Sequence, residues 1–227
     1  MGRRLRGIVA GETYHAFTRG SNKLPIFFEP LDLTVFLLQL GRVVANYGWV
    51  LYSYCLMPNH YHLLVRVPDG GLSEGMRDLN GGFSRRMSKR HSRVAHLFQN
   101  RFGHNWIADE QAFLTAARYV VRNPVEAGLC EHVVDWPWSS FRATVRDEPA
   151  PDWLDVDGLL AHFEVFAPGR PREGYRRFVE GDELPATRGC GTSNVTRVPQ
   201  QDAAAAPTDL LTSRKSQKPV SGTETRM

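Results

Sequence analysis

The amino-acid sequence predicts an α+β domain built on a mostly antiparallel β-sheet. Strand-like and helix-like segments follow one another in the order strand, helix, strand, strand, helix, strand, helix. The two adjacent strands in this order are separated only by the turn-like Met57-Pro58-Asn59, so they can pair as a hairpin. Together these observations favour a sheet with helices on one face.

Three strands and one helix are predicted in the first half of the chain. The strands are rich in aromatic and β-branched residues and cover residues 14–18, 49–56 and 60–67. Residues 32–47 carry apolar side chains at helical spacing, which predicts a helix that Gly48 ends. Turn-like sequences, Arg19-Gly20-Ser21-Asn22 and Pro68-Asp69-Gly70-Gly71, follow the first and third strands.

The second half continues the alternation. A basic helix is predicted over 72–90, interrupted or weakened near Gly81-Gly82, and a strand over 98–108. The helix over 109–123 is expected to end at Pro124, because proline disfavours helical geometry in the residue before it. Two further short helices are expected over 155–163 and 172–179. The order of elements is that of a ferredoxin-like fold.

One domain with appendages is the expected organisation. A chain of 227 residues, 42% of them hydrophobic, can bury one substantial core. From about residue 180 onward there is no aromatic residue, and small and polar residues dominate, which predicts a disordered tail. The expected units are a main domain over 1–145, a helical extension packed on it over 146–180, and a tail over 181–227.

Composition argues against several classes of protein. No apolar run approaches the roughly 18 residues that span a bilayer, and the N-terminal segment lacks the apolar stretch of a secretory signal. A soluble, cytoplasmic protein is therefore expected. The cysteines, Cys55, Cys130 and Cys190, are odd in number and widely spaced, so neither a disulfide framework nor a cysteine zinc site is indicated.

The segment 77–101 has a strong excess of positive charge. Its only acid is Asp78. Its basic residues are Arg77, Arg85, Arg86, Lys89, Arg90, Arg93 and Arg101. This local imbalance points to a polyanionic partner; a solvated helix face is a common origin of such a charge run, but the near absence of acids argues against it here.

His60 and His62 are the first candidates for chemistry. They lie two residues apart in a predicted strand, so both side chains point to one face, while Tyr61 and Leu63 point to the other. The pair can hold one metal ion, but two histidines placed by chance on a half-buried strand give the same pattern. A hydrolase with two zinc ions would need an Asp and a further His directly downstream, and a histidine-triad transferase would need a His in place of Leu64. Neither class fits.

A second candidate group lies on the helix before Pro124. Four of its side chains fall within roughly 40° of one another at helical spacing. They are Ala112, Ala116, Tyr119 and Asn123. Tyr119 therefore lies beside the apolar stripe with two alanines that leave space around it. By helix pattern alone, a tyrosine packed at the edge of the core explains this position as well.

Three longer motifs occur in a fixed order along the chain. They are CLMPNHYHLLV at 55–65, RYVVRNPVEAGL at 118–129 and WPWSSF at 136–141. They resemble, in turn, the HUH signature, the helix of the catalytic tyrosine and the stretch that follows it in the single-tyrosine transposases, especially the REP-associated tyrosine transposases of bacteria. The resemblance covers roughly residues 14–178.

The resemblance implies a role for each candidate residue. The fold would be the ferredoxin-like HUH domain, His60 and His62 would be metal ligands, and Tyr119 would be the nucleophile. Asn123 occupies the position of the third ligand, one helical turn beyond the tyrosine. Separately from the resemblance, the charge imbalance of the segment 77–101 predicts that the basic helix contacts DNA phosphates, through Arg85, Arg86, Lys89, Arg90 and Arg93.

The implied activity is metal-dependent cleavage and strand transfer of single-stranded DNA through a 5′-phosphotyrosine, in DNA transposition or in the processing of repetitive hairpin elements. The cofactor would be a divalent ion, Mg²⁺ or Mn²⁺, and the partner single-stranded or hairpin DNA in the bacterial cytoplasm, associated with the nucleoid. The residues leave open whether the chain acts as a monomer or a homodimer. Two alternatives also stay open: a catalytically idle DNA-binding or regulatory protein with the same fold, and an RNA-processing metalloenzyme.

Overall fold

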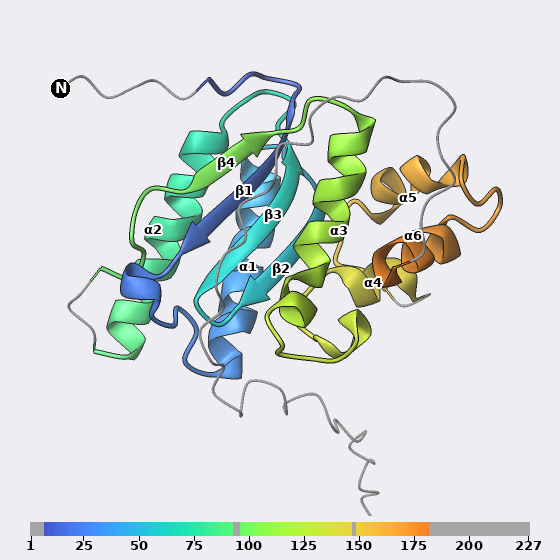
Figure 1. The fold of residues 1–227 in the computed structure, drawn as a ribbon. Coiled ribbons are helices and arrows are strands. Elements are labelled where there is room, and N and C mark those ends of the chain that lie inside the picture. The colour runs from blue at the N-terminus through green and yellow to red at the C-terminus, as the bar shows by residue number, and fades with distance from the viewer. Residues whose placement is uncertain (1–6, 93–95, 147–148, 182–227) are drawn as a thin grey trace, which may run out of the picture.

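A four-stranded antiparallel sheet forms the centre of the computed structural model, which describes residues 7–92, 96–146 and 149–181 (Figure 1). The strand order is β2-β3-β1-β4. The strands are β1 (Thr13–Arg19), β2 (Val50–Met57), β3 (His60–Arg66) and β4 (Gly103–Trp106). The predicted α+β class and the β2–β3 hairpin are confirmed. The predicted strand over 98–108 is too long, because its first part makes only an isolated bridge between Gly20 and Phe98.

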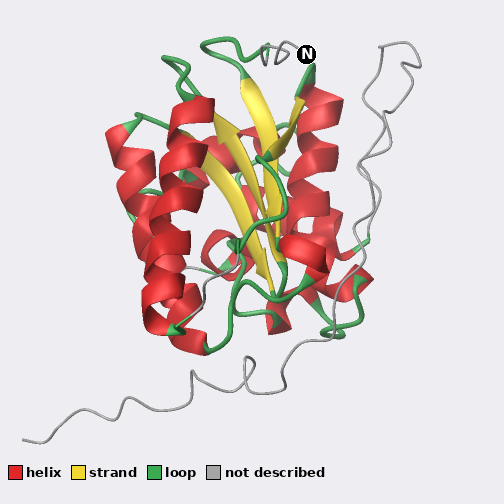
Figure 2. Cartoon of the chain, turned by 90° about the vertical axis from the view of Figure 1, so that its left-hand side faces the viewer, coloured by secondary structure: helices red, strands yellow, loops and turns green. Residues whose placement is uncertain are grey.

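Helices cover both faces of the sheet (Figure 2). Helices α1 (Pro30–Asn46) and α2 (Leu72–Arg90) lie on one face, where the Tyr61 ring packs 4.6 Å from that of Phe36. Helix α3 (Glu110–Glu126) covers the other face. The expectation of helices on one face is therefore wrong. The physical reason is that β3 is an interior strand, buried along nearly its whole length, so both of its faces need a covering layer.

Helix α2 runs without a break through Gly81 and Gly82, so the predicted interruption there is also wrong. A side chain at Gly82 would meet the Gln39 amide of α1 at 2.9 Å, and one at Gly75 would overlap the Trp49 ring. These glycines therefore permit close packing of the helix, and that packing outweighs their low helix propensity.

The free edge of β2 is covered by the segment that contains the WPWSSF motif. The Leu56 amide donates to the Trp138 carbonyl at 2.9 Å, and the Ser140 amide donates to the Tyr54 carbonyl at 3.0 Å. The Trp136 indole also donates to the Leu56 carbonyl, at 2.9 Å. This motif thus satisfies backbone groups that an edge strand would otherwise expose. Short helices precede and follow it, η2 (Val133–Asp135) and α4 (Phe141–Val145), neither of which was predicted.

Two C-terminal helices pack beside α3, close to their predicted positions. They are α5 (Val156–Glu164) and α6 (Pro171–Glu180). The Arg122 guanidinium of α3 donates to the Val179 carbonyl at 2.7 Å, and Arg118 lies over the Phe178 ring. Helix α3 is therefore held between the sheet and α6. The division at residues 145 and 180 stays a prediction, and residues 182–227 of the expected tail lie outside the described residues.

Within the described ranges, no helix is both long enough and apolar enough to cross a membrane.

Candidate active site

Strand β3 directs His60 and His62 toward α3. Both residues are fully buried, whereas Tyr61 points to the opposite face and donates to the Asn80 amide oxygen of α2 at 2.6 Å. The alternation of side chains along the strand therefore brings two imidazoles together under α3. Their ring centroids are 5.0 Å apart.

Asn59 fixes the tautomer of His60. Its amide nitrogen donates to the Lys23 carbonyl at 2.9 Å, which leaves Oδ1 as the atom that lies 2.6 Å from Nδ1 of His60. Because Oδ1 only accepts, Nδ1 carries the hydrogen and Nε2 keeps a lone pair. Burial, together with the charge of Arg19, lowers the pKa of His60 to about 3, so the ring is neutral.

His15 on β1 holds His62 in a similar way. Nε2 of His15 lies 2.9 Å from Nδ1 of His62, and the two rings stack with centroids 5.0 Å apart. Burial lowers the pKa of His15 to about 4 and holds that of His62 well below its usual value. The sequence interpretation missed His15, because a lone histidine on a short strand has no motif. The only feature of the sequence that could have pointed to His15 is its place on the same strand face as Phe17.

The unsatisfied nitrogen atoms suit a metal ion. Nε2 of His60 and Nε2 of His62 are buried and have no hydrogen-bond partner among the described residues. A buried polar atom without a partner is costly, and a neutral imidazole with a free lone pair is the form that binds metals. The β3 histidines therefore fit the ligand role implied by the sequence.

Helix α3 places Tyr119 against this pair. Asp109 caps the helix by accepting from the Ala112 amide at 2.8 Å. The Tyr119 ring meets the His62 ring edge-on at 5.5 Å and the His15 ring at 5.6 Å. Burial, with a smaller contribution from the Glu126 carboxylate, raises the pKa of the phenol to about 12.

Asn123 completes the group, and Pro124 helps to orient it. The prediction that the helix ends at Pro124 is wrong, because α3 continues to Glu126. Proline has no N–H to offer the carbonyl of Val120, four residues earlier. The Asn123 amide nitrogen lies 3.4 Å from that carbonyl oxygen and 2.7 Å from the Tyr119 carbonyl oxygen. The amide nitrogen is thus occupied by the helix backbone, which leaves Oδ1 as the available ligand atom.

Asn123 also affects the pKa values of the neighbouring side chains. Its amide opposes the effect of burial on the pKa of His60, His62 and Tyr119. Of the residues named from the sequence, the structure therefore brings together the two histidines, the tyrosine and the asparagine.

A second cluster of possible metal ligands lies on the other face, at Glu29, Asp32 and His91. The Arg90 guanidinium already binds this cluster, at 2.8 Å from Glu29 and 3.4 Å from Asp32. Asp32 also accepts the Phe28 amide at 2.9 Å, next to the start of α1. A cation is thus already present in the side chains themselves, and we interpret the cluster as an ion-pair network that ties the end of α2 to α1.

The predicted DNA contacts lie on the face opposite to the histidines. Arg85, Arg86 and Lys89 are exposed on α2, whereas Arg90 is engaged in the ion pairs just described. Arg93 lies outside the described residues. The basic helix is therefore separate from the histidine and tyrosine site, although its C-terminal half runs toward the end of the sheet where β3 begins.

Comparisons with known proteins agree with this geometry. The family model described as "Transposase IS200 like" matches residues 9–123. Over 124 residues the chain is 31% identical to a Haemophilus influenzae protein assigned to the REP-associated tyrosine transposases, a match that covers 49% of this chain and 70% of the relative. It is 25% identical over 153 residues to the REP-associated tyrosine transposase of Escherichia coli K12, covering 66% of this chain and 87% of the relative.

The fold is similar to that of a solved REP-associated tyrosine transposase bound to a REP hairpin. The TM-score is 0.54 at 22% sequence identity, and the match covers 68% of this chain and 94% of that structure. At this identity the structural likeness concerns the fold alone, while the family model and the sequence relatives establish kinship. The chain therefore belongs to the IS200-like transposase family, among the REP-associated tyrosine transposases.

Proposed function

We propose that this chain cleaves and rejoins single-stranded DNA next to a hairpin, with Tyr119 as the nucleophile. The observation that carries the proposal is the contact of the Tyr119 ring with His62, beside two buried imidazole nitrogens that have no hydrogen-bond partner in the described part of the chain. A hairpin substrate is supported by the solved relative, which was captured on a REP hairpin.

The phenol oxygen attacks the scissile phosphorus. The phenol gives up its proton to the solvent as a bond forms between its oxygen and phosphorus, the bond from phosphorus to the 3′ oxygen breaks, and the leaving oxygen takes up a proton. The products are a 5′-phosphotyrosine and a free 3′-OH. Because the new phosphodiester keeps the energy of the old one, a DNA 3′-OH can later attack it and restore the strand without ATP.

The raised pKa of the Tyr119 phenol supports a role for a metal ion in the proposed reaction. A phenol whose pKa is about 12 is almost fully protonated near neutral pH, so its attack needs compensation for negative charge. His60, His62 and Asn123 would hold a divalent ion, Mg²⁺ or Mn²⁺, that polarises a nonbridging phosphate oxygen when bound. Two imidazoles and one amide oxygen suit Mn²⁺, whereas Mg²⁺ generally prefers oxygen ligands alone.

One chain contributes both the tyrosine and the histidines, so we expect cleavage in cis. A mixture of His62→Ala and Tyr119→Phe chains should then form no covalent adduct with hairpin DNA, because neither variant owns a complete site. Denaturing gels of the mixture measure the covalent adduct. Wild-type protein diluted into either variant serves as the control. Recovery of the adduct in the mixture would show that α3 acts on the partner chain.

His15 is expected to act as a positioning residue for His62. Without its ring, the His62 imidazole loses both a hydrogen bond and a stacking partner, so Mn²⁺ binding should weaken by roughly 10-fold to 100-fold in His15→Ala. Mn²⁺ titration followed by electron paramagnetic resonance measures affinity independently of cleavage.

The exposed His132 provides the matched control, since His132→Ala should leave the Mn²⁺ affinity unchanged. Wild-type Mn²⁺ affinity in a correctly folded His15→Ala protein would contradict the positioning role.

A further inference from the structure

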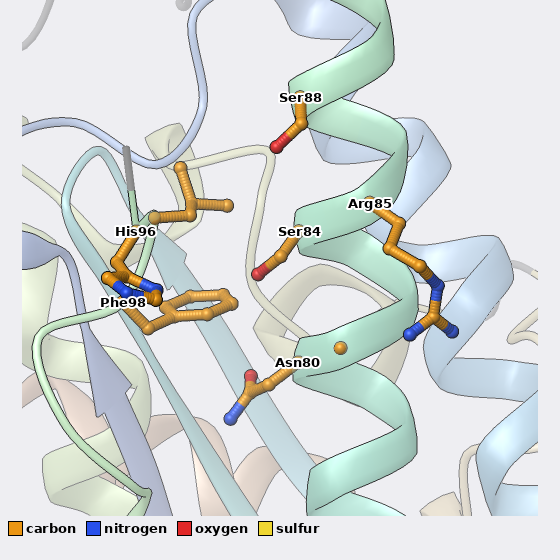
Figure 3. Close-up of a pocket in the computed structure, with 8 residues that line it drawn as sticks. Asn80, Ser84, Arg85, Ser88, His96 and Phe98 are labelled. Carbon is orange, nitrogen blue, oxygen red and sulfur yellow. The ribbon is translucent and has the colours of Figure 1, made fainter. Parts of the chain in front are cut away.

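A cavity of about 440 Å³ lies between α2 and the segment 96–98, outside the histidine and tyrosine site (Figure 3). Asn80, Ser84 and Ser88 follow one another at one-turn spacing along α2 and form one wall. The hydroxyl groups of both serines point toward the opposite wall, where the ring of Phe98 lies. We refer to this space as the α2 cavity.

The α2 cavity has the chemistry of a nucleotide site. Hydroxyl and amide groups can donate to and accept from the polar edge of a base, and the Phe98 ring offers a face for stacking. Arg85 is also among the lining residues, and its side chain leaves α2 on the side away from Phe98, with the guanidinium 3.4 Å from where a side chain at Gly81 would begin. Among the described residues that line the cavity none is acidic, so no negative side chain there would repel a phosphate.

The α2 cavity is connected to the active site by backbone pairing. The Ser21 amide donates to the Leu97 carbonyl at 3.0 Å, and the Gln99 amide donates to the Arg19 carbonyl at 2.9 Å. Arg19 in turn lies opposite His60 in the β1–β3 register. The Phe98 wall therefore lies beside the end of β1, at the end of the sheet where the histidine strand β3 begins. Tyr119 lies on the other face of the sheet.

One polar contact chain links α2 to β1 and β3 on this face of the sheet. The Asn80 amide nitrogen donates to the Thr18 hydroxyl at 3.1 Å, while its oxygen accepts from Tyr61, the residue between the two histidines. The Asn80 side chain is thus held rigidly at the floor of the α2 cavity, as is required of a group that recognises a ligand.

We propose that the α2 cavity binds one unpaired nucleotide of the DNA strand that flanks the cleaved bond. The base would lie against Phe98 and the α2 hydroxyls, and a neighbouring phosphate would meet Arg85, with Arg86 and Lys89 further along the helix. A base within a duplex is stacked on both sides and cannot enter such a space, so the occupant is single-stranded. This inference rests on the proposed function, because it takes the strand held by Tyr119 as the ligand.

Two variants and one control test the α2 cavity. Ser84→Leu fills it from α2, and Phe98→Leu removes the stacking face but keeps an apolar side chain. Ser73→Leu is the control. It makes the same substitution as Ser84→Leu on the same side of α2, about three turns away and outside the cavity. All three are combined with Tyr119→Phe, so that binding is measured without covalent capture, and their folding is checked by circular dichroism.

The probes are a DNA hairpin with an unpaired flank, the same hairpin without the flank, and flanked hairpins with 2-aminopurine at successive flank positions. We expect Ser84→Leu and Phe98→Leu to weaken binding of the flanked hairpin by on the order of tenfold, and to leave the hairpin without flank unaffected. One flank position should change its fluorescence on binding, and this change should be lost in both variants but kept in Ser73→Leu.

Wild-type affinity and an unchanged fluorescence pattern in folded Ser84→Leu would overturn the inference. A parallel adduct assay with the unsubstituted chain on the same DNA separates the two proposals. If the adduct forms but the cavity variants bind the flanked hairpin as tightly as the control, only the role of the α2 cavity is refuted. If no adduct forms, the proposed function is refuted, while the binding data still decide whether the α2 cavity holds a nucleotide.

Discussion

Replacing Tyr119 with phenylalanine is expected to abolish covalent capture of DNA, lowering adduct formation by at least about 10⁴-fold, because the attacking oxygen is lost. DNA binding should stay close to wild type, since the half-buried ring keeps its contacts with His15 and His62. Denaturing gels of a labelled hairpin DNA with Mn²⁺ measure the adduct, and fluorescence anisotropy measures binding.

Tyr175→Phe is the matched control. It also removes one phenolic oxygen, from a fully buried ring between α5 and α6 whose hydroxyl lacks a hydrogen-bond partner within the described part of the chain. This variant should form the adduct normally. A Tyr119→Phe protein that still captures DNA would assign the nucleophile to another residue.

Loss of either β3 histidine should have the second largest effect. His60→Ala or His62→Ala is expected to reduce metal-dependent cleavage on the order of a thousandfold, because the metal contributes several kcal/mol of charge stabilisation. Neither neighbour can replace the lost ligand, since Tyr61 faces the opposite side of the sheet and hydrogen-bonds to Asn80. Cleavage rates over a wide range of Mn²⁺ concentration, together with Mn²⁺ affinity, measure the loss.

His104→Ala controls for removal of a histidine from the same sheet. This residue lies on β4 opposite Ala16 and beside the Tyr14 and Phe102 rings, so the alternation along β1 puts it on the sheet face opposite to His15 and His62. Its cleavage should stay within a few-fold of wild type. If His60→Ala and His62→Ala cleave as fast as this control at every metal concentration, the metal assignment is wrong.

Local periodicity predicted the parts of the fold that depend on neighbouring residues. A strand alternates its side chains whatever covers it, so the spacing of two placed His60 and His62 on one face and Tyr61 on the other. The spacing along α3 likewise put Tyr119 and Asn123 on one side of that helix. Strand and helix limits follow the same rule, and most lie within a few residues of their predicted positions.

Features that depend on tertiary packing could not be predicted in this way. Helix α3 continues through Pro124, which is buried in a helix that packs on β2 and β3. Gly82 stays helical because α1 lies directly against it. The contact of His15 with His62 joins strands 47 residues apart in sequence, and no spacing rule reaches that far. The second covering layer, α3, follows from the burial of β3 on both faces.

Mapping the covalent link by mass spectrometry tests the central claim most directly. Wild-type protein is incubated with hairpin DNA and Mn²⁺, digested with protease and nuclease, and the modified peptide is sequenced. The proposed mechanism predicts a single nucleotide remnant joined through its 5′-phosphate to the Tyr119 oxygen, in the peptide that also contains Val120 and Val121. A remnant on any other side chain, or cleaved DNA with no attached peptide, would contradict it.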